Sequence, residues 1–118
     1  MKDNVVKEKS FNFALRIIKL SQYMQKEYNE FVLSKQVLRS GTAIGALIRE
    51  SEHAESKLDF IHKLAIAQKE SNETDYWLEL IYQSKYIDEK LYNSIETDIK
   101  EIIKLLASII ITSKAKYK

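Results

Sequence analysis

Apolar residues recur with a period of about 3.6 along four stretches of the chain, which is the spacing of amphipathic helices. The first helix is predicted over about 10–27, with Ser10 as its N-cap, and the second over about 33–54. The third runs over about 56–85, and the fourth fills most of 89–113. No stretch alternates apolar and polar residues as a half-buried strand does. The pattern therefore predicts an all-α protein.

The predicted connections between the helices are short, and short connections imply antiparallel neighbours. Ser56 begins the third helix, because Ser56 with Asp59 three residues later matches the capping-box pattern, with Asp in place of the usual Glu or Gln. No linker and no internal repeat divides the chain. The sequence therefore predicts a single domain, residues 1–118, folded as an antiparallel up-down-up-down four-helix bundle.

The first and fourth predicted helices carry more apolar surface than a monomeric bundle needs. The first leaves only a narrow polar strip, formed by Asn12, Arg16, Lys19, Tyr23 and Lys26. The fourth spreads its apolar residues wider than one seam, with Ile95, Ile99, Ile102, Ile103, Leu106, Ile109 and Ile110. Large apolar patches are rare on monomers. We therefore expect a homo-oligomer that buries both faces; the alternative is a small monomer with an apolar exterior.

The only two glycines of the chain, Gly41 and Gly45, lie four residues apart inside the second predicted helix. A glycine in a helix interior costs about 1 kcal/mol relative to alanine. Without side chains at these positions, a neighbouring helix can approach more closely than the usual 8–10 Å between helix axes, roughly. Close helix packing is therefore the favoured explanation. A phosphate-binding loop is not, because no strand precedes this helix.

The amino-acid composition limits which cellular compartments and which kinds of reaction we expect for this protein. The 118 residues include no cysteine, which excludes disulfides and thiolate catalysis and fits a reducing cytosol. The first ten residues lack the apolar stretch of a signal peptide. The longest apolar run, residues 105–111, is far shorter than the roughly 18 residues that suggest a membrane span. We therefore expect a cytoplasmic protein with no membrane partner.

Charge is distributed unevenly, although the formal net charge is only +2. Residues 1–26 carry +4, residues 27–101 carry −6, and residues 102–118 carry +4. In the predicted topology the two basic termini lie at the same end of the bundle, which would place Lys7, Lys9 and Arg16 near Lys114, Lys116 and Lys118. The polar strip of the first helix adds basic residues and one aromatic, Tyr23, a composition typical of phosphate-contacting surfaces.

These positions predict an RNA-binding surface, although most lysine strips are simply solvated faces. The candidate RNA-binding residues are Lys7, Lys9, Arg16, Lys19, Lys114, Lys116 and Lys118.

The nearest approach to a metal signature is Glu50-x-x-His53 together with Asp59-x-x-His62. Di-iron bundles use a Glu-x-x-His motif on each of two helices and a Glu from each of the others. Here the second motif begins with Asp, and the first helix has no carboxylate in its central turns. We expect solvated or capping histidines, no metal and no cofactor. A carboxylate-bridged metalloprotein remains an alternative that metal analysis would test.

Glu70 and Glu73 share a helix stripe, as Arg39 does with Glu50 on the preceding helix. Paired carboxylates can perform acid–base chemistry, but no nucleophile or glycine-rich loop accompanies them. We interpret these residues as partners in ion pairs that fix the register of the helices. The sequence therefore does not predict an enzyme.

Two segments of the second and third helices carry a resemblance to a known family: LRSGTAIGALIRES at 38–51 and SKLDFIHKLAIAQKESNETDYWLEL at 56–80. They resemble the bacterial four-helix bundle family of 23S ribosomal RNA intervening-sequence proteins. The matching residues are Arg39, Ser40, Ile44, Gly45, Ala46, Ile48, Glu50, Ser56, Asp59, Phe60, Ile61, Lys69, Glu70, Glu73, Thr74, Tyr76, Trp77 and Leu78. Leu47 departs from the pattern, which often has Asn there.

The resemblance implies a homo-oligomer, often a pentamer, and association with structured RNA. It also relates the chain to the accessory variability protein of diversity-generating retroelements. The expectation is thus a non-enzymatic, ribosomal-protein-like bundle that binds RNA. The alternative is a structural or adaptor protein that binds another protein and has no nucleic-acid role.

Overall fold

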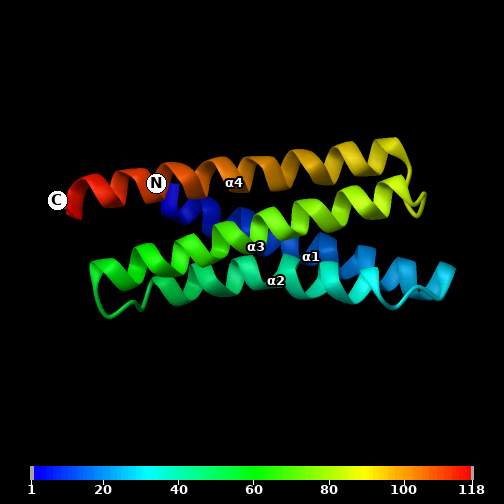
Figure 1. The fold of residues 1–118 in the computed structure, drawn as a ribbon, viewed down its shortest axis with the longest axis horizontal. Coiled ribbons are helices and arrows are strands. Elements are labelled where there is room, and N and C mark those ends of the chain that lie inside the picture. Colours follow the sequence, from blue (N-terminus) through cyan, green and yellow to red (C-terminus); the bar gives the residue numbers. More distant parts are fainter. Residues whose placement is uncertain (1, 118) are drawn as a thin grey trace.

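The computed structural model describes residues 2–117, and their side chains from 4 to 116. It contains four helices, α1 (Lys2–Tyr28), α2 (Leu33–Ser51), α3 (Lys57–Gln83) and α4 (Glu89–Tyr117). Consecutive helices run antiparallel and α4 returns to lie beside α1, which closes an elongated bundle (Figure 1). The prediction of an all-α up-down-up-down four-helix bundle is confirmed.

The first helix begins earlier than the sequence pattern predicts. α1 starts at Lys2, and Ser10 is not its N-cap but a buried residue inside the helix, whose hydroxyl donates to the Lys7 carbonyl at 3.0 Å. The physical reason is Val6, which is fully buried and extends the core stripe of α1 by two turns beyond Phe13. One apolar anchor thus holds an otherwise polar segment in the helix.

The other helix ends differ by a few residues from the prediction. α2 ends at Ser51 and α3 at Gln83, shortly before Lys85 adopts a left-handed conformation with φ of 68°. α4 continues beyond Ser113 to Tyr117.

Side chains cap the N-termini of the last three helices. The predicted Ser56 cap is confirmed: its hydroxyl accepts the Asp59 N–H at 3.0 Å. Asp88 caps α4 by accepting the Leu91 N–H at 2.8 Å. Glu30 caps α2, because its carboxylate accepts hydrogen bonds from the backbone N–H groups at the start of that helix. Burial acts to raise the pKa of Glu30, but these hydrogen bonds outweigh burial, and the pKa is lowered. The Glu30 cap has no short sequence pattern and was not predicted.

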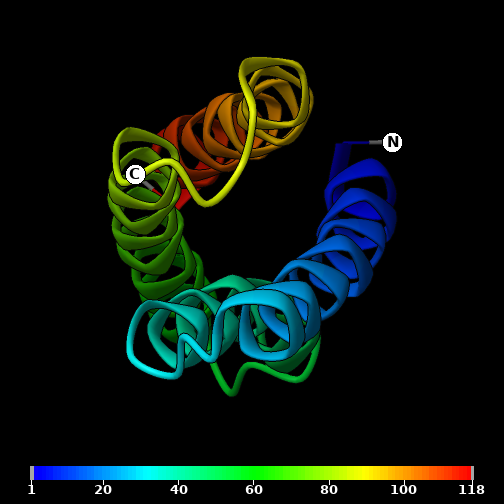
Figure 2. The same ribbon diagram turned by 90° about the vertical axis from the view of Figure 1, so that its right-hand side faces the viewer.

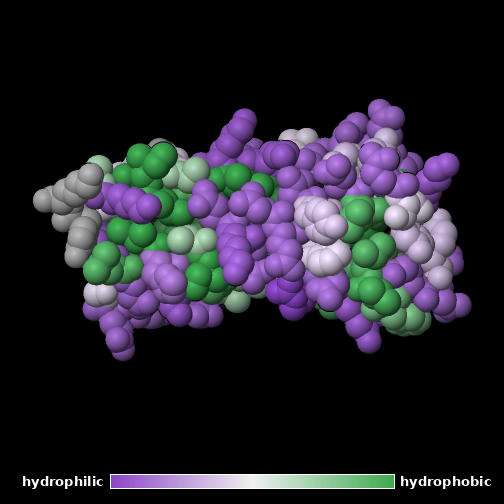
Figure 3. Space-filling view, in the orientation of Figure 1, coloured by the Kyte–Doolittle hydropathy of each residue, from purple (hydrophilic) through white to green (hydrophobic). Residues whose placement is uncertain are grey.

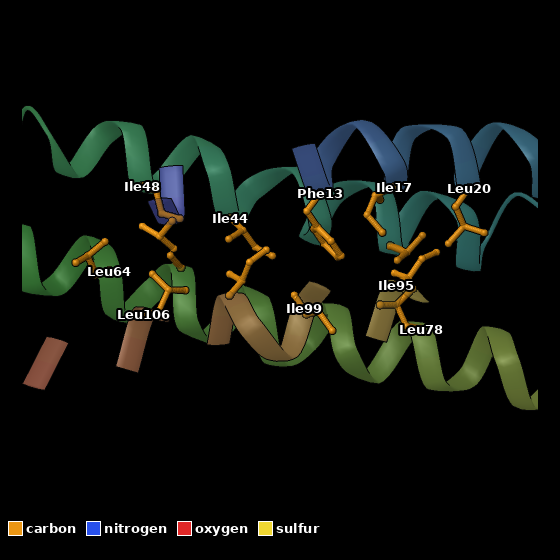
Figure 4. Packing of buried hydrophobic residues seen from close by; sticks show 14 of the residues in the cluster. Phe13, Ile17, Leu20, Ile44, Ile48, Leu64, Leu78, Ile95, Ile99 and Leu106 are labelled. Carbon is orange, nitrogen blue, oxygen red and sulfur yellow. The ribbon is translucent and has the colours of Figure 1, made fainter. Parts of the chain in front are cut away.

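The core is a continuous column of aliphatic side chains from all four helices (Figure 4). Ile17, Ile44, Leu78 and Ile99 are fully buried in it. The predicted surplus apolar face of α4 is absent from the described chain: of the residues assigned to that face, only Ile103 escapes full burial. The isoleucines of α4 cover two seams, one against α1 and one against α3, which explains their wide spread around the helix.

The two glycines lie against α1, as the spacing predicted. A Cβ on Gly41 would come within 2.9 Å of Ile17 Cγ2, so only glycine fits there without a shift. A Cβ on Gly45 would lie 3.5 Å from the Ser10 hydroxyl, an ordinary contact. Gly41 is therefore the position with no room for a side chain, whereas Gly45 is where the α1 backbone itself comes close, with Ser10 C and O 3.6 Å from such a Cβ.

Candidate nucleic-acid interface

α1 begins and α4 ends at the same end of the bundle, as the predicted topology requires (Figure 1). Lys114 and Lys116 are exposed on the last turns of α4, and within the described chain no acidic side chain pairs with either of them. Lys118 lies outside the described residues. From residue 102 onward the sequence contains no Asp or Glu, so the charge of this end is not compensated along the helix.

Two other candidates on α1 form ion pairs near this end of the chain. Lys7 Nζ lies 2.9 Å from Glu52, and Lys9 pairs with Glu101, a hydrogen bond that raises the pKa of Lys9. All four side chains are more than a third exposed, so solvent and salt screen these pairs. Their charge is largely compensated by acids of the same chain, which the sequence pattern does not predict.

Arg16 lies in the middle of the bundle rather than at its basic end. Its Nη1 donates to Asp98 at 2.6 Å and its Nη2 to Ser94 at 3.0 Å, both on α4. Arg16 thus bridges α1 and α4. Lys19, one turn further along α1, is exposed and makes no ion pair with any described residue.

Next to Arg16 and Lys19, a hollow of about 350 Å³ opens between α1 and α4. Its floor is formed by Leu20 and Ile95, and its rim includes Tyr23 and Leu91. A second hollow of about 190 Å³ continues along the same edge on the other side of Arg16. The predicted polar strip of α1 therefore borders a partly apolar groove.

A chain of tyrosines leads from this hollow to the turn end of the bundle. The Tyr23 and Tyr28 rings pack edge to face with their centroids 5.9 Å apart, and the Tyr28 and Tyr86 rings do so with their centroids 5.1 Å apart. A hydrogen bond with Tyr28 is the main cause that raises the pKa of Tyr23. The sequence pattern identified Tyr23 but not its partners.

The predicted ion pairs of Arg39 are confirmed. Its guanidinium pairs with Glu70 at 3.2 Å and with Glu73, which also accepts the indole N–H of Trp77 at 3.2 Å. Beneath them, the buried hydroxyls of Thr74 and Ser40 share a hydrogen bond of 2.8 Å across the α2–α3 seam. These residues belong to the motif that resembles the known family, and here they position α3 on α2.

A carboxyl cluster between α3 and α4 was not predicted. Lys100 Nζ lies 2.9 Å from Asp75 and 3.5 Å from Glu96. Glu96 Oε2 is buried and has no hydrogen-bond partner among the described residues. Burial is the main cause that raises the pKa of Glu96 to about 7, and the neighbouring Asp75 carboxylate adds to it. Glu96 therefore keeps its proton to a higher pH than an exposed carboxyl group does.

The histidines of the metal-like motif, His53 and His62, are exposed. Over the described residues no three side chains of His, Asp, Glu or Cys lie together as a metal site would require. No helix in that same part of the chain is both long and apolar enough to cross a bilayer.

Exposed apolar side chains gather on α1 as Phe11, Leu15 and Ile18, which are 49%, 46% and 36% exposed; we call these the α1 apolar face. Arg49 of α2 lies over the Phe11 ring at 5.3 Å. On the opposite side of the bundle, apolar side chains form two patches separated by a polar band (Figure 3). The surplus apolar surface predicted for the first helix is therefore present.

The chain is similar to proteins of one family. A family model described as 23S rRNA-intervening sequence protein matches residues 2–108. A solved structure from Bacteroides thetaiotaomicron, described as a protein with unknown function from the S23 ribosomal protein family, is 60% identical with a TM-score of 0.92. The match covers 93% of this chain and 98% of that one. No protein of curated function matches.

Proposed function

Because the chain belongs to the 23S rRNA-intervening sequence protein family, we propose that it is a non-enzymatic, oligomeric four-helix bundle that binds structured RNA. The observation that carries the proposal is the lysine-rich end of α4. Lys104, Lys114 and Lys116 are exposed there and pair with no described carboxylate. Unpaired lysines can exchange counterions for phosphates without first breaking an ion pair.

Removing these charges should weaken RNA binding. The triple variant Lys104→Gln, Lys114→Gln, Lys116→Gln is expected to bind a structured RNA at least tenfold more weakly at low salt. The slope of log affinity against log salt should become shallower by about 0.7–0.9 for each phosphate that the variant no longer neutralises. Fluorescence anisotropy with a labelled RNA hairpin over a salt series measures both quantities.

The matched control removes three exposed lysines elsewhere, Lys35, Lys69 and Lys85. It changes the net charge by the same amount and should keep most of the affinity. Equal losses of affinity in the two triple variants would mean that only net charge matters. A parent protein with no salt-sensitive binding would refute the RNA role.

The α1 apolar face supports the proposed oligomer. Its three side chains are spaced four and three residues apart, so they form one stripe along the helix. Apolar surface of this kind on a small protein marks an interaction site. A second copy of the chain is the proposed occupant, and the pentamer is the stoichiometry implied by the family resemblance.

Placing a charge in this stripe should dissociate the assembly. Light scattering is expected to give a mass several times 13.8 kDa for the parent and close to 13.8 kDa for Leu15→Glu. Val32→Glu, at an apolar position that is 71% exposed in the α1–α2 turn, is the control and should stay oligomeric. A monomeric parent at micromolar concentration would contradict the prediction.

The second candidate function is a protein adaptor, and the α1 apolar face is the observation that favours it. An adaptor would use that face for a different protein instead of a second copy. A monomeric parent that also fails to bind RNA would make the adaptor the better interpretation.

A further inference from the structure

The edge between α1 and α4 is the most open of the bundle's four seams. These two helices meet less extensively than any other neighbouring pair, and the view along the bundle shows them diverging (Figure 2). The two hollows lie along this edge on either side of Arg16. The larger one, with a volume of about 350 Å³, is lined in part by Tyr23 and Leu91, and we call it the base-sized hollow.

We infer that the base-sized hollow is a docking site for a single unpaired base of a bound RNA, with the phosphate of that nucleotide held by Lys19 and Arg16. The inference rests on the proposed function and makes it more specific. It predicts that the protein prefers RNAs with a bulged or looped nucleotide to fully paired ones.

The surfaces of the base-sized hollow suit a flat, partly apolar ring. Leu20 and Ile95 are only 4% and 2% exposed and form an aliphatic floor, while Leu91 and Tyr23 stand at the rim. The volume of about 350 Å³ lies at the lower end of the range of small-ligand sites, roughly 300–1,000 Å³. Unpaired bases that are splayed out of an RNA helix commonly stack on such aromatic side chains.

The charge of the lining suits a phosphate. Two of its six residues, Arg16 and Lys19, are cationic, and none is acidic. Arg16 uses one N–H for Asp98 and one for Ser94, which leaves donors of its guanidinium available. Lys19 has no carboxylate partner in the described chain. Glu27 and Asp88, whose negative charges help to raise the pKa of Tyr23, do not line the hollow.

The tyrosine chain holds the stacking ring in place before RNA binds. Tyr23 is fixed edge to face by Tyr28, which is fixed in turn by Tyr86. A side chain that is already ordered loses less conformational entropy on binding.

The test compares two hairpins with the same stem, one fully paired and one with a single bulged 2-aminopurine, a fluorescent adenine analogue. The parent is expected to bind the bulged hairpin about tenfold more tightly and to change the 2-aminopurine fluorescence. Tyr23→Ala should lose this preference and the fluorescence change, while it still binds the paired hairpin. Lys19→Gln should weaken binding of the bulged hairpin more than that of the paired one.

Tyr76→Ala is the matched control, because Tyr76 is an exposed tyrosine of α3 that does not line the hollow. It should behave as the parent does. Salt-sensitive binding by the parent with equal affinity for both hairpins and unchanged fluorescence would overturn base docking but leave the RNA proposal standing. No binding of either hairpin would overturn both. The fluorescence of the parent complex decides the question even where Tyr23→Ala does not fold.

Discussion

Replacing Gly41 by leucine is expected to lower the free energy of unfolding by about 3 kcal/mol, at the upper end of what overpacking costs. The Cβ of the new side chain alone would lie 2.9 Å from Ile17 Cγ2 and 3.0 Å from Cγ1. Ile17 is fully buried and branched at Cβ, so it has no free space into which to turn. α1 and α2 must therefore separate. Urea denaturation followed by circular dichroism measures the change.

Alanine at the two glycines provides the sharper comparison. Gly45→Ala should stabilise the protein by about 0.5–1 kcal/mol, because it gains helix propensity and its Cβ makes an ordinary contact with Ser10. Gly41→Ala gains the same propensity but should still be less stable than the parent by about 1 kcal/mol. Leucine at Gly45 should overfill the seam and cost about 1–3 kcal/mol. A stabilised Gly41→Ala protein would show that the seam is not tight.

The second large effect is on the pH dependence of stability, through Glu96. Its pKa is about 7 in the folded protein and 4.5 in the reference state. Between these values the folded protein holds a proton that the unfolded chain has released, so the free energy of unfolding falls as the pH rises from about 4.5 to about 7. The full shift corresponds to about 3 kcal/mol. Because the Glu96 side chain is 20% exposed, we expect a loss of about 1–2 kcal/mol.

Glu96→Gln separates this group from all other titrating residues. Glutamine resembles the protonated acid, since it is uncharged and can donate to Asp75. It should therefore raise the free energy of unfolding by about 1–2 kcal/mol at about pH 8 and change it little at about pH 5. Asp98→Asn, at a carboxylate of α4 outside this cluster, is the control for loss of charge. Parallel stability curves for the parent and Glu96→Gln would contradict the assignment.

The fold was largely predictable because the helices follow local rules. Periodicity predicts the number and order of helices, the Ser56 cap predicts the start of α3, and the glycine pair predicts a close helix contact, which the structure places at the α1–α2 seam. The early start of α1 was not predictable from periodicity, because Val5 and Val6 are the only apolar residues between Met1 and Ser10. Burial of Val6 depends on packing against the rest of the bundle.

The candidate site was predictable only in part, because its interactions depend on register between distant segments. A helical wheel marks Arg39, Glu70 and Glu73 as candidates for ion pairs, but it does not specify that Arg39 pairs with both glutamates. Arg16 and Asp98 are 82 residues apart in the sequence, and their contact depends on the axial offset between α4 and α1. Nothing within a single helix specifies that offset. The same holds for Asp75 and Glu96, which meet across the α3–α4 seam.

The first turn of α1 and the last turn of α4 lie at the same end of a molecule that is 49 Å long (Figure 1). A tag, fluorophore or fusion partner joined to either terminus therefore lies at the same end of the bundle, which we call a pole. Immobilisation through such a tag would leave the opposite pole, with the turns that follow Tyr28 and Gln83, facing the solution. It would also bring Lys114 and Lys116 close to the support. Two surfaces that carry different parts of the proposed RNA contact can thus be shielded or presented by the choice of attachment alone.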